Sequence, residues 1–538
     1  MSFKTRLACT LATAALMGAA PLAAPMSAQA QSVTLKPTTD GLSASIRLTT
    51  PTTRFRFQDA GVARDDWTAP TRDAPTRDAR LSGDAVEGAG DAFDRFTLLL
   101  KPDTTEEGRG YIAVTRVGDG YLLFAPALTG ADDTLQLTLD APQTWTLWPA
   151  NDVSGYVYVG PVARIEQRVG GAAIMAPGLS PQVRTTALDT FDTAVNFFGH
   201  RFGAPPKPPT LVFTDQGAGP ISFRGDVTDT EVISARLHGD DWAEPTDSAL
   251  SDIRLLVFHE SVHLWNSHFA VPAEGSPWLH EGGAQYLALV AASSTGVLNH
   301  EDGLDAISAS LTNCRRAVGQ SRSLAERIAG GPAMYDCGVT IQWLADLELR
   351  HASNGQRGVI DVWRDLIAQA RAGRPDYGPA DFVSDLPAGS AVPALFDAPA
   401  DQRWSALEAR LTALGVRWEN RPSRQTYLMA ALSHLNASNC APGVSKGYYL
   451  RDGYVQMDND AACGALAGDL ELGKIEGFDP MADARPMFEA VQTRCAAGEP
   501  VRFTARGQTM VREALCKTPL ATPLAYALTI APPLATQD

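Results

Sequence analysis

The chain has 538 residues, of which 45% are apolar and 20% are charged, and its formal net charge is -16. A chain this long and this apolar can bury several cores, which excludes a disordered polymer, a coiled coil and a disulfide-dominated miniprotein. The acidic balance, without any cluster of Lys and Arg interleaved with aromatic residues, argues against nucleic acid or an anionic membrane surface as a partner.

Residues 1–30 have the pattern of an export signal. Lys4 and Arg6 precede an Ala/Leu-rich stretch that runs to about Ala24, and Ala28-Gln29-Ala30 offers small residues where a signal peptidase reads them. The stretch is short and interrupted by two prolines, and no later segment reaches the ~18 uninterrupted apolar residues of a spanning helix. We therefore expect cleavage after Ala30 and a soluble periplasmic or secreted protein without membrane insertion.

The mature chain keeps an even number of cysteines, which in an exported protein predicts disulfide bonds. Sequence alone does not choose their connectivity, although pairing in sequence order would close three short loops. The six cysteines are Cys314, Cys337, Cys440, Cys463, Cys495 and Cys516.

The elements predict a multidomain α+β protein. Residues 31–170 read as an N-terminal β-sandwich, because short β-branched or aromatic runs alternate with Gly, Asp and Pro. The stretch Thr68–Gly90 reads as a solvated loop. The expected strands are Ser43–Thr50, Arg95–Leu100, Tyr111–Arg116, Tyr121–Phe124 and Leu135–Leu139.

Residues 171–420 read as a second domain, first α/β and then helical. A helix is expected over Ser180–Phe202, followed by buried strands at Pro209–Thr214 and Glu231–Leu237. From Asp247 to about Gly415 almost every periodic segment is helical. Residues 421–538 return to a mixed pattern and form the expected third domain, with four of the six cysteines.

One cluster carries chemistry, the H-E-x-x-H sequence from His259 to His263. The preceding segment Ala249–Phe258 is apolar at helical spacing and begins after Asp247 or Ser248, both good N-caps. On a helix, His259 and His263 lie one turn apart on one face, so both imidazoles can reach a single ion. Glu260, adjacent to the first ligand, projects beside that ion.

A catalytic zinc needs a third protein ligand and an open position for water. Ser276-Pro277 is typical of a helix start, so a second helix is expected from there to about Ala292, with Glu281 in its second turn. Glu281 can complete a site for one Zn²⁺ with the two histidines. Zinc bound in this way lowers the pKa of its water toward ~7, and Glu260 can take the proton and pass it to a leaving amine.

The block His259–Tyr286 resembles the gluzincin metallopeptidases, the clan of aminopeptidase N, leukotriene hydrolase and the glycyl aminopeptidases. Their signature is H-E-x-x-H-x-W, a spacer, then W-L-x-E-G with an aromatic residue four positions on; Trp265 and Tyr286 fill the aromatic places. The resemblance implies a thermolysin-like catalytic domain, with zinc at His259, His263 and Glu281 and with Glu260 as general base.

A second likeness concerns Tyr335. The segment Tyr335–Gly338, before an expected helix Val339–Leu349, resembles the family's Tyr-x-x-Gly segment. The resemblance implies that the Tyr335 hydroxyl stabilises the tetrahedral oxyanion. A bridge between Cys314 and Cys337 would fix this tyrosine's loop.

The chain also departs from the family. It lacks the Gly-x-Met-Glu-Asn motif, whose glutamate binds the free amine of the substrate in the aminopeptidases, and the corresponding region is Gly225–Glu231. Asp226, Asp229 or Glu231 could substitute, but the spacing chooses none of them. Whether the expected peptidase is an aminopeptidase or an endopeptidase therefore stays open.

The C-terminal part is similar to the second half of a PDZ domain, which glycyl aminopeptidases of the same clan carry. The likeness covers Gly464–Gly477, a helix near Arg485–Cys495 and Val501–Arg506, but the carboxylate-binding Gly-Leu-Gly-Phe loop is not evident.

The sequence thus predicts an exported zinc metallopeptidase that acts on a peptide or protein. One alternative is a non-catalytic peptide-binding or scaffold protein that retains the fold, and another is a hydrolase of a non-peptide ester or epoxide. His268 and His280 are expected near the ligands or in solvent rather than on the metal. Trp265, Trp278 and Tyr286 are expected to hold the two helices together. The oligomeric state is left open.

Overall fold

The computed structural model describes residues 29–534, apart from 59–61, 63, 65, 70–79, 89, 91, 104–110, 131–132, 218–221, 268–270, 274–275, 320–322, 375 and 452. The chain divides into two compact units, one ending at Val162 and the other beginning at Ala163. The expected export signal lies outside the described residues except for its last two positions. None of the described helices combines the length and apolarity that crossing a membrane requires.

The first unit is built of strands. One five-stranded sheet has the order β10-β1-β2-β7-β4, a four-stranded sheet has the order β11-β12-β9-β8, and a small sheet has the order β3-β6-β5. Buried and exposed residues alternate along β2, as they do in a strand with one face in a core. The strands are β1 (Gln29–Pro37), β2 (Leu42–Thr52), β3 (Arg54–Arg56), β4 (Trp67–Thr68), β5 (Arg80–Ser82), β6 (Ala85–Glu87), β7 (Phe93–Leu100), β8 (Val114–Val117), β9 (Gly120–Phe124), β10 (Asp133–Leu139), β11 (Trp145–Trp148) and β12 (Tyr156–Pro161).

These strands confirm the expected ones, with a later start for β8. The predicted loop Thr68–Gly90 is wrong in part, because β5 and β6 form a hairpin there, and residues 70–79 lie outside the described residues.

The second unit begins with a mixed five-stranded sheet of order β13-β14-β15-β17-β16. Its inner strands β14, β15 and β17 are parallel, whereas β13 and β16 run antiparallel at the two edges. Because β13 pairs with β14, the unit starts before the boundary expected after residue 170. The strands are β13 (Ile165–Arg168), β14 (Gly171–Met175), β15 (Thr210–Asp215), β16 (Ser222–Thr228) and β17 (Val232–His238).

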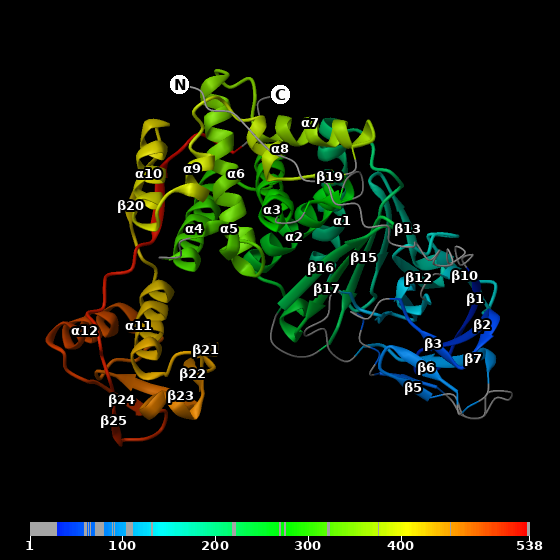
Figure 1. The fold of residues 1–538 in the computed structure, drawn as a ribbon, viewed down its shortest axis with the longest axis horizontal. Helices are drawn as coiled ribbons and strands as arrows, with labels where there is room; N and C mark the ends of the chain where they lie inside the picture. Colours follow the sequence, from blue (N-terminus) through cyan, green and yellow to red (C-terminus); the bar gives the residue numbers. More distant parts are fainter. Residues whose placement is uncertain are drawn as a thin grey trace, which may run out of the picture. The chain divides into compact units, whose positions relative to one another are not determined.

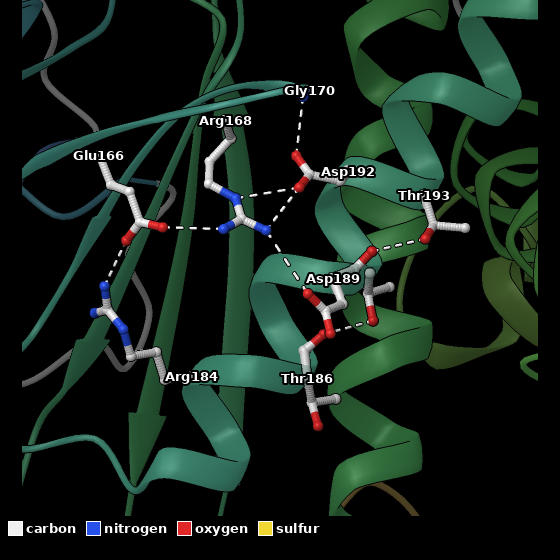
Figure 2. Close-up of polar contacts among 9 residues, drawn as sticks. Glu166, Arg168, Gly170, Arg184, Thr186, Asp189, Asp192 and Thr193 are labelled. Atoms are coloured by element: carbon white, nitrogen blue, oxygen red, sulfur yellow. Dashed lines mark hydrogen bonds and ion pairs between the residues drawn. The ribbon is translucent and has the colours of Figure 1, made fainter.

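Polar contacts fasten the β13–β14 hairpin to α1 (Pro181–Phe202) (Figure 2). The Arg168 guanidinium donates to Glu166 on its own strand and to Asp192 on α1, at 3.0 Å and 2.7 Å. The other oxygen of Asp192 accepts from the Gly170 N–H at 2.9 Å. These bonds join the edge of the sheet to the helix that connects β14 with β15.

The helices that follow pack together as the sequence predicts. Figure 1 shows α3, α4 and α6 side by side, in green to yellow-green, and these pairs are in contact. The helices are α2 (Asp247–Asn266), α3 (Pro277–Ser294), α4 (His300–Val318), α5 (Leu324–Arg327), α6 (Pro332–Ala352), α7 (Val359–Arg371), α8 (Pro379–Ser384), α9 (Val392–Asp397) and α10 (Ala400–Ala413); a two-residue pair joins β18 (Val271–Pro272) to β19 (Asp376–Tyr377).

The C-terminal part forms an antiparallel sheet of order β21-β22-β23-β24-β25, whose apolar face shares a core with two helices. The expected likeness to a PDZ domain stays a prediction. The elements are β20 (Arg417–Asn420), α11 (Arg424–Asn439), β21 (Lys446–Arg451), β22 (Tyr454–Asn459), β23 (Gly468–Ile475), α12 (Ala484–Ala497), β24 (Val501–Ala505), β25 (Val511–Ala514) and β26 (Tyr526–Ile530).

The end of the described chain returns to the helical part. Strand β26 pairs with β20, and the hydroxyl of Tyr526 donates to Glu408 at 2.7 Å. Leu528 and Leu534 join the large core around α2 and α3. The last segment, from β26 to Leu534, therefore packs with the helical part, whereas the residues from α11 to Leu520 share a core of their own. The expected division after residue 420 stays a prediction.

Disulfides join the cysteines in sequence order. Within the described chain the bridges are Cys314–Cys337, Cys440–Cys463 and Cys495–Cys516. The first links α4 to α6, and the other two lie in the C-terminal part. The prediction that all six cysteines form disulfides is confirmed.

Candidate active site

The first half of the site comes from α2. The Thr246 side chain accepts from the Ala249 N–H at 3.2 Å and caps this helix, rather than Asp247 or Ser248 as the sequence analysis expected. The last two turns, which carry His259 and His263, are buried all round. The helix is thus held by the core on every side, and its two imidazoles have fixed positions.

The second half comes from α3, which begins at Pro277 as predicted. Trp278 packs on Phe396 and Phe382, and Tyr286 donates to Asp346 at 2.8 Å, so both side chains are structural. Trp265 on α2 is buried and donates to the Gly203 carbonyl at 2.8 Å. All three side chains are buried, but these contacts join α2 to the end of α1, and α3 to α6, α8 and α9. The expectation that they hold α2 and α3 to each other stays a prediction.

The three predicted ligands converge. His259 Nε2 lies 3.3 Å from His263 Nε2 and 3.3 Å from Glu281 Oε2. The distance from His263 Nε2 to Glu281 Oε2 is 3.6 Å. Two helices therefore bring two ring nitrogens and one carboxylate oxygen to a single point.

This donor set fits a zinc ion. Ligand atoms placed about 2.0–2.1 Å from a tetrahedral zinc lie roughly 3.3 Å apart, which is the spacing of these three atoms. Two neutral imidazoles and one carboxylate are a donor set of catalytic zinc sites. A single ion could thus be held by His259, His263 and Glu281 without a large movement of the helices.

Asn266, one turn after His263, fixes the tautomer of that histidine. Its Nδ2 donates to the carbonyl of His280 at 3.2 Å, which leaves Oδ1 to accept from His263 Nδ1 at 2.9 Å. With Nδ1 bonded to Asn266, Nε2 is the ring nitrogen that can give up its proton and offer a lone pair to a metal ion.

No atom of His280 is among the three converging atoms, in agreement with the expectation that this histidine lies near the ligands and not on the metal. Its Nδ1 is 2.8 Å from the hydroxyl of Tyr377, and its Nε2 is 3.7 Å from Glu281 Oε1. His280 thus lies between the Tyr377 hydroxyl and Oε1 of Glu281, the carboxylate oxygen that is not among the three converging atoms. His268, for which the same expectation was stated, lies outside the described residues.

His263 and Glu281 shift each other's pKa in opposite directions. Burial alone would lower the pKa of His263, but its hydrogen bond to Glu281 and the negative charge of that group outweigh burial and raise it to about 9. Burial alone would raise the pKa of Glu281, but hydrogen bonds from His259 and His263 and the positive charge of these histidines hold it well below its ordinary value.

Glu260 lies beside the three converging groups and is 6% exposed. Burial raises the pKa of its carboxyl above the ordinary value, although the two neighbouring histidines act in the opposite direction. Its outer side is covered by Gly225 on β16, where a β-carbon would overlap the Glu260 carboxylate. The sequence analysis did not predict β16, whose only local signal is the short alternation around Gly225.

Tyr335 reaches the same cluster from α6. Its ring lies 5.9 Å from that of His259, and burial together with the negative charge of Glu281 raises the pKa of its phenol. The expectation that Tyr335 precedes the helix is wrong, because α6 already begins at Pro332. The close approach of two glycines explains its position: a β-carbon on Gly282 would overlap the backbone of Gly338, so α3 and α6 touch next to Glu281 and Tyr335.

Two links tie this end of α6 to α4. The disulfide Cys314–Cys337 is buried, and the neighbouring Asn313 side chain donates to Asp336 at 3.4 Å. Both links lie within two residues of Tyr335. They hold the first turn of the helix that carries the tyrosine, rather than a loop.

Of the acids considered as amine anchors, Asp226 lies near enough to Glu260 for its charge to raise the pKa of that carboxyl. Asp226 forms a two-pronged ion pair with Arg236, at 3.1 Å and 2.9 Å. Asp229 and Glu231 lie at the turn between β16 and β17, and Glu231 is buried there with a positive φ of 58°.

Comparison with known proteins bears on the fold. No protein-family model and no curated protein sequence matches the chain. Among solved structures, an aminopeptidase N family protein from Idiomarina loihiensis superposes with a TM-score of 0.64 at 13% identity, covering 93% of this chain and 98% of that one.

Two further matches are weaker. An M1 zinc metallopeptidase from Deinococcus radiodurans has a TM-score of 0.40 at 15% identity, covering 71% of this chain and 93% of that one. The yeast LTA4 hydrolase in complex with bestatin has a TM-score of 0.36 at 10% identity, covering 76% and 72%. The overlap with the first structure extends over nearly the whole of both chains, and the protein therefore has a gluzincin aminopeptidase-like fold.

Proposed function

We propose that the protein is an exported zinc-dependent metallopeptidase that hydrolyses peptide bonds. His259, His263 and Glu281 hold one Zn²⁺, Glu260 is the general base, and Tyr335 stabilises the oxyanion. The observation that supports this most is the convergence of the three ligand atoms, 3.3 to 3.6 Å apart, with a buried glutamate beside them. A protein that only bound peptides would have no use for that glutamate.

Zinc bound by these residues would polarise the substrate carbonyl and make a water easier to deprotonate. Glu260 accepts the proton of the attacking water and passes it to the nitrogen of the leaving amine. Its raised pKa suits this task, because a buried carboxyl holds the proton long enough to hand it on. The carbonyl oxygen gains negative charge as the water adds.

Tyr335 donates its O–H to that oxygen. Burial and the nearby Glu281 raise the pKa of the phenol, so it stays protonated and can donate throughout the ordinary pH range. A donor placed where charge develops favours the transition state over the ground state.

Export is part of the proposal. The leader-like residues 1–30 and the disulfides between all six remaining cysteines support a periplasmic or secreted location. The substrate is accordingly a peptide or protein of that compartment.

A substrate panel tests the activity. Amino-acid amidomethylcoumarins report cleavage beside a free amine, and internally quenched peptides with acetylated N-termini report cleavage that needs none. We expect cleavage that a chelator abolishes and zinc restores. The Glu260→Gln variant should keep its zinc and lose turnover, whereas Glu301→Gln, on an exposed surface of α4, should behave as the unaltered protein.

Zinc-loaded protein that cleaves neither kind of substrate would count against a peptidase. Equal turnover by the Glu260→Gln variant would refute the role of Glu260.

A further inference from the structure

His280 contacts both halves of the candidate site. It directly precedes Glu281 on α3, and its carbonyl accepts from the side-chain nitrogen of Asn266 on α2 at 3.2 Å. Its ring lies against that of His263, with the ring centroids 4.7 Å apart and the planes tilted by 34°. The position of His280 therefore affects groups on both helices that would hold the ion.

The two carboxylate oxygens of Glu281 have different neighbours. Oε2 lies 3.3 Å from His259 Nε2 and 3.6 Å from His263 Nε2. Oε1 lies 3.7 Å from Nε2 of His280, which is about 0.5 Å beyond a hydrogen bond, so a small rotation of either side chain closes the gap. An N–H donated to Oε1 leaves Oε2 for the ion. A carboxylate that binds through one oxygen also leaves room for the water that a catalytic zinc needs.

Tyr377 determines which ring nitrogen of His280 carries the proton. Its hydroxyl lies 2.8 Å from Nδ1 of His280, and within the described part of the chain this nitrogen is its one hydrogen-bond partner. Tyr377 is 4% exposed, so a hydroxyl that only accepted from Nδ1 would keep a buried proton without an acceptor, which is costly. The hydroxyl therefore donates to a lone pair on Nδ1, and the ring proton is on Nε2, on the side of Glu281.

Tyr377 is held in place by contacts that do not involve its hydroxyl. Strand β19, which contains it, pairs with β18 in the connection between α2 and α3, and the N–H of Ala273 donates to the Tyr377 carbonyl at 2.8 Å. Its ring packs edge-on against that of Trp363 on α7, with the centroids 5.4 Å apart. Loss of the hydroxyl alone would thus leave the tyrosine in position and remove only its bond to His280.

We propose that Tyr377 and His280 are positioning residues for the third metal ligand. The Tyr377 hydroxyl donates to Nδ1 of His280, and Nε2 of His280 donates to Oε1 of Glu281, so that Oε2 faces the ion. The proposal rests on the proposed zinc site and adds the groups that orient one of its ligands. Neither side chain binds the ion, and both act through Glu281. Removal of such a partner typically weakens metal binding by about 10- to 100-fold.

The zinc affinity of the full-length protein, measured by competition with a chromophoric chelator, tests this inference. His280→Leu removes the donor to Oε1 and should weaken zinc binding by about 10- to 100-fold. His280→Gln, whose amide can place an N–H near the position of Nε2, should keep part of the affinity. Tyr377→Phe keeps the ring against Trp363 and should weaken binding by about 3- to 10-fold, as expected for the loss of one neutral hydrogen bond.

A double variant separates positioning from a general loss of packing. Because Tyr377 is proposed to act only through His280, adding Tyr377→Phe to His280→Leu should weaken zinc binding no further, whereas two independent defects would add. Tyr526→Phe is the matched control, because Tyr526 is also 4% exposed and its hydroxyl also donates a hydrogen bond, to Glu408 at 2.7 Å. This control should keep the zinc affinity of the unaltered protein.

Three results would overturn the role of Tyr377 and His280 while the zinc site and the peptidase function stand: unchanged affinity in Tyr377→Phe, losses that add in the double variant, or an equal loss in Tyr526→Phe. If His280→Leu does not fold, the comparison of Tyr377→Phe with Tyr526→Phe decides alone. An unaltered protein that binds no zinc would overturn the proposed function together with this inference.

Discussion

The proposed metal side of the site and its substrate side are built from different kinds of element. The metal side comes from α2 and α3, two helices that follow one another in the chain and are buried around their functional residues. The substrate side combines an edge strand, β16, with the first turn of α6, far apart in the sequence. The first side depends on helical spacing, whereas the second depends on where backbones touch.

Two glycine contacts create the substrate side. Gly225 brings β16 against Glu260, and Gly282 with Gly338 brings α6 against α3. A β-carbon at Gly225 would overlap the Glu260 side chain, and one at Gly282 or Gly338 would overlap backbone, so tertiary packing sets the positions of Tyr335 and of β16. The comparison predicts the largest losses for the metal-side groups that bind the ion or move the proton, and smaller losses for changes that act only through packing on the substrate side.

The largest effect is expected at Glu260. Glu260→Gln removes the base but none of the three ligands, so kcat should fall by up to about 10⁴-fold while zinc content stays the same. Steady-state kinetics and metal analysis on the same preparation check this. A variant that loses its zinc would show instead that Glu260 helps to hold the ion.

The next effect is expected at Tyr335. Tyr335→Phe removes one donor to the oxyanion, so kcat should fall by about 10²- to 10³-fold with little change in KM. The ring and its packing remain, and the melting temperature is the control for an intact fold. An unchanged kcat would refute the role of the Tyr335 hydroxyl at the oxyanion and show that Tyr335 is a packing residue.

Helical spacing and local signals explain why the metal side could be predicted. The His259–His263 spacing predicts the helix of the two histidines, and Ser276-Pro277 predicts the start of the helix that carries Glu281. The substrate side could not be predicted in this way. Only the resemblance to a family segment points to Tyr335, and the helix start expected at Val339 is wrong because α6 begins at Pro332.

The edge strand shows the same limit more clearly. Gly225 has no neighbour in sequence that reveals its contact with Glu260, and the pairing of Asp226 with Arg236 depends on the register of β16 and β17. Such contacts arise between segments, so no periodicity in one segment encodes them. The return of β26 to β20 escaped prediction for the same reason.

A smaller effect is expected at Asn266. Asn266→Ala removes the acceptor that orients His263, and loss of such a partner typically weakens metal affinity by about 10- to 100-fold. Competition with a chromophoric zinc chelator measures the change. If affinity is unaffected, another group fixes the His263 tautomer, and the hydrogen bond from His263 Nδ1 is structural only.

The smallest effect is expected from packing on the substrate side. Gly338→Ala forces α6 away from α3 and should lower the free energy of unfolding by about 1–3 kcal/mol and reduce kcat while zinc affinity is retained. Gly199→Ala is the control, because Gly199 lies in α1 with nothing near the position of a β-carbon. This variant should have the free energy of unfolding of the unaltered protein or a higher one. Equal results for the two variants would refute the contact between Gly282 and Gly338 as the cause of the Tyr335 position.

The central claim is that two histidines and one glutamate on α2 and α3 bind a single ion. Its most direct measurement is the zinc content of the protein purified without chelator, compared with that of the variants His259→Ala, His263→Ala and Glu281→Ala. We predict one zinc per chain in the unaltered protein and little in any of the three variants that still fold. Less than one zinc per chain in protein supplied with the metal, or full zinc content in all three variants, would contradict the claim.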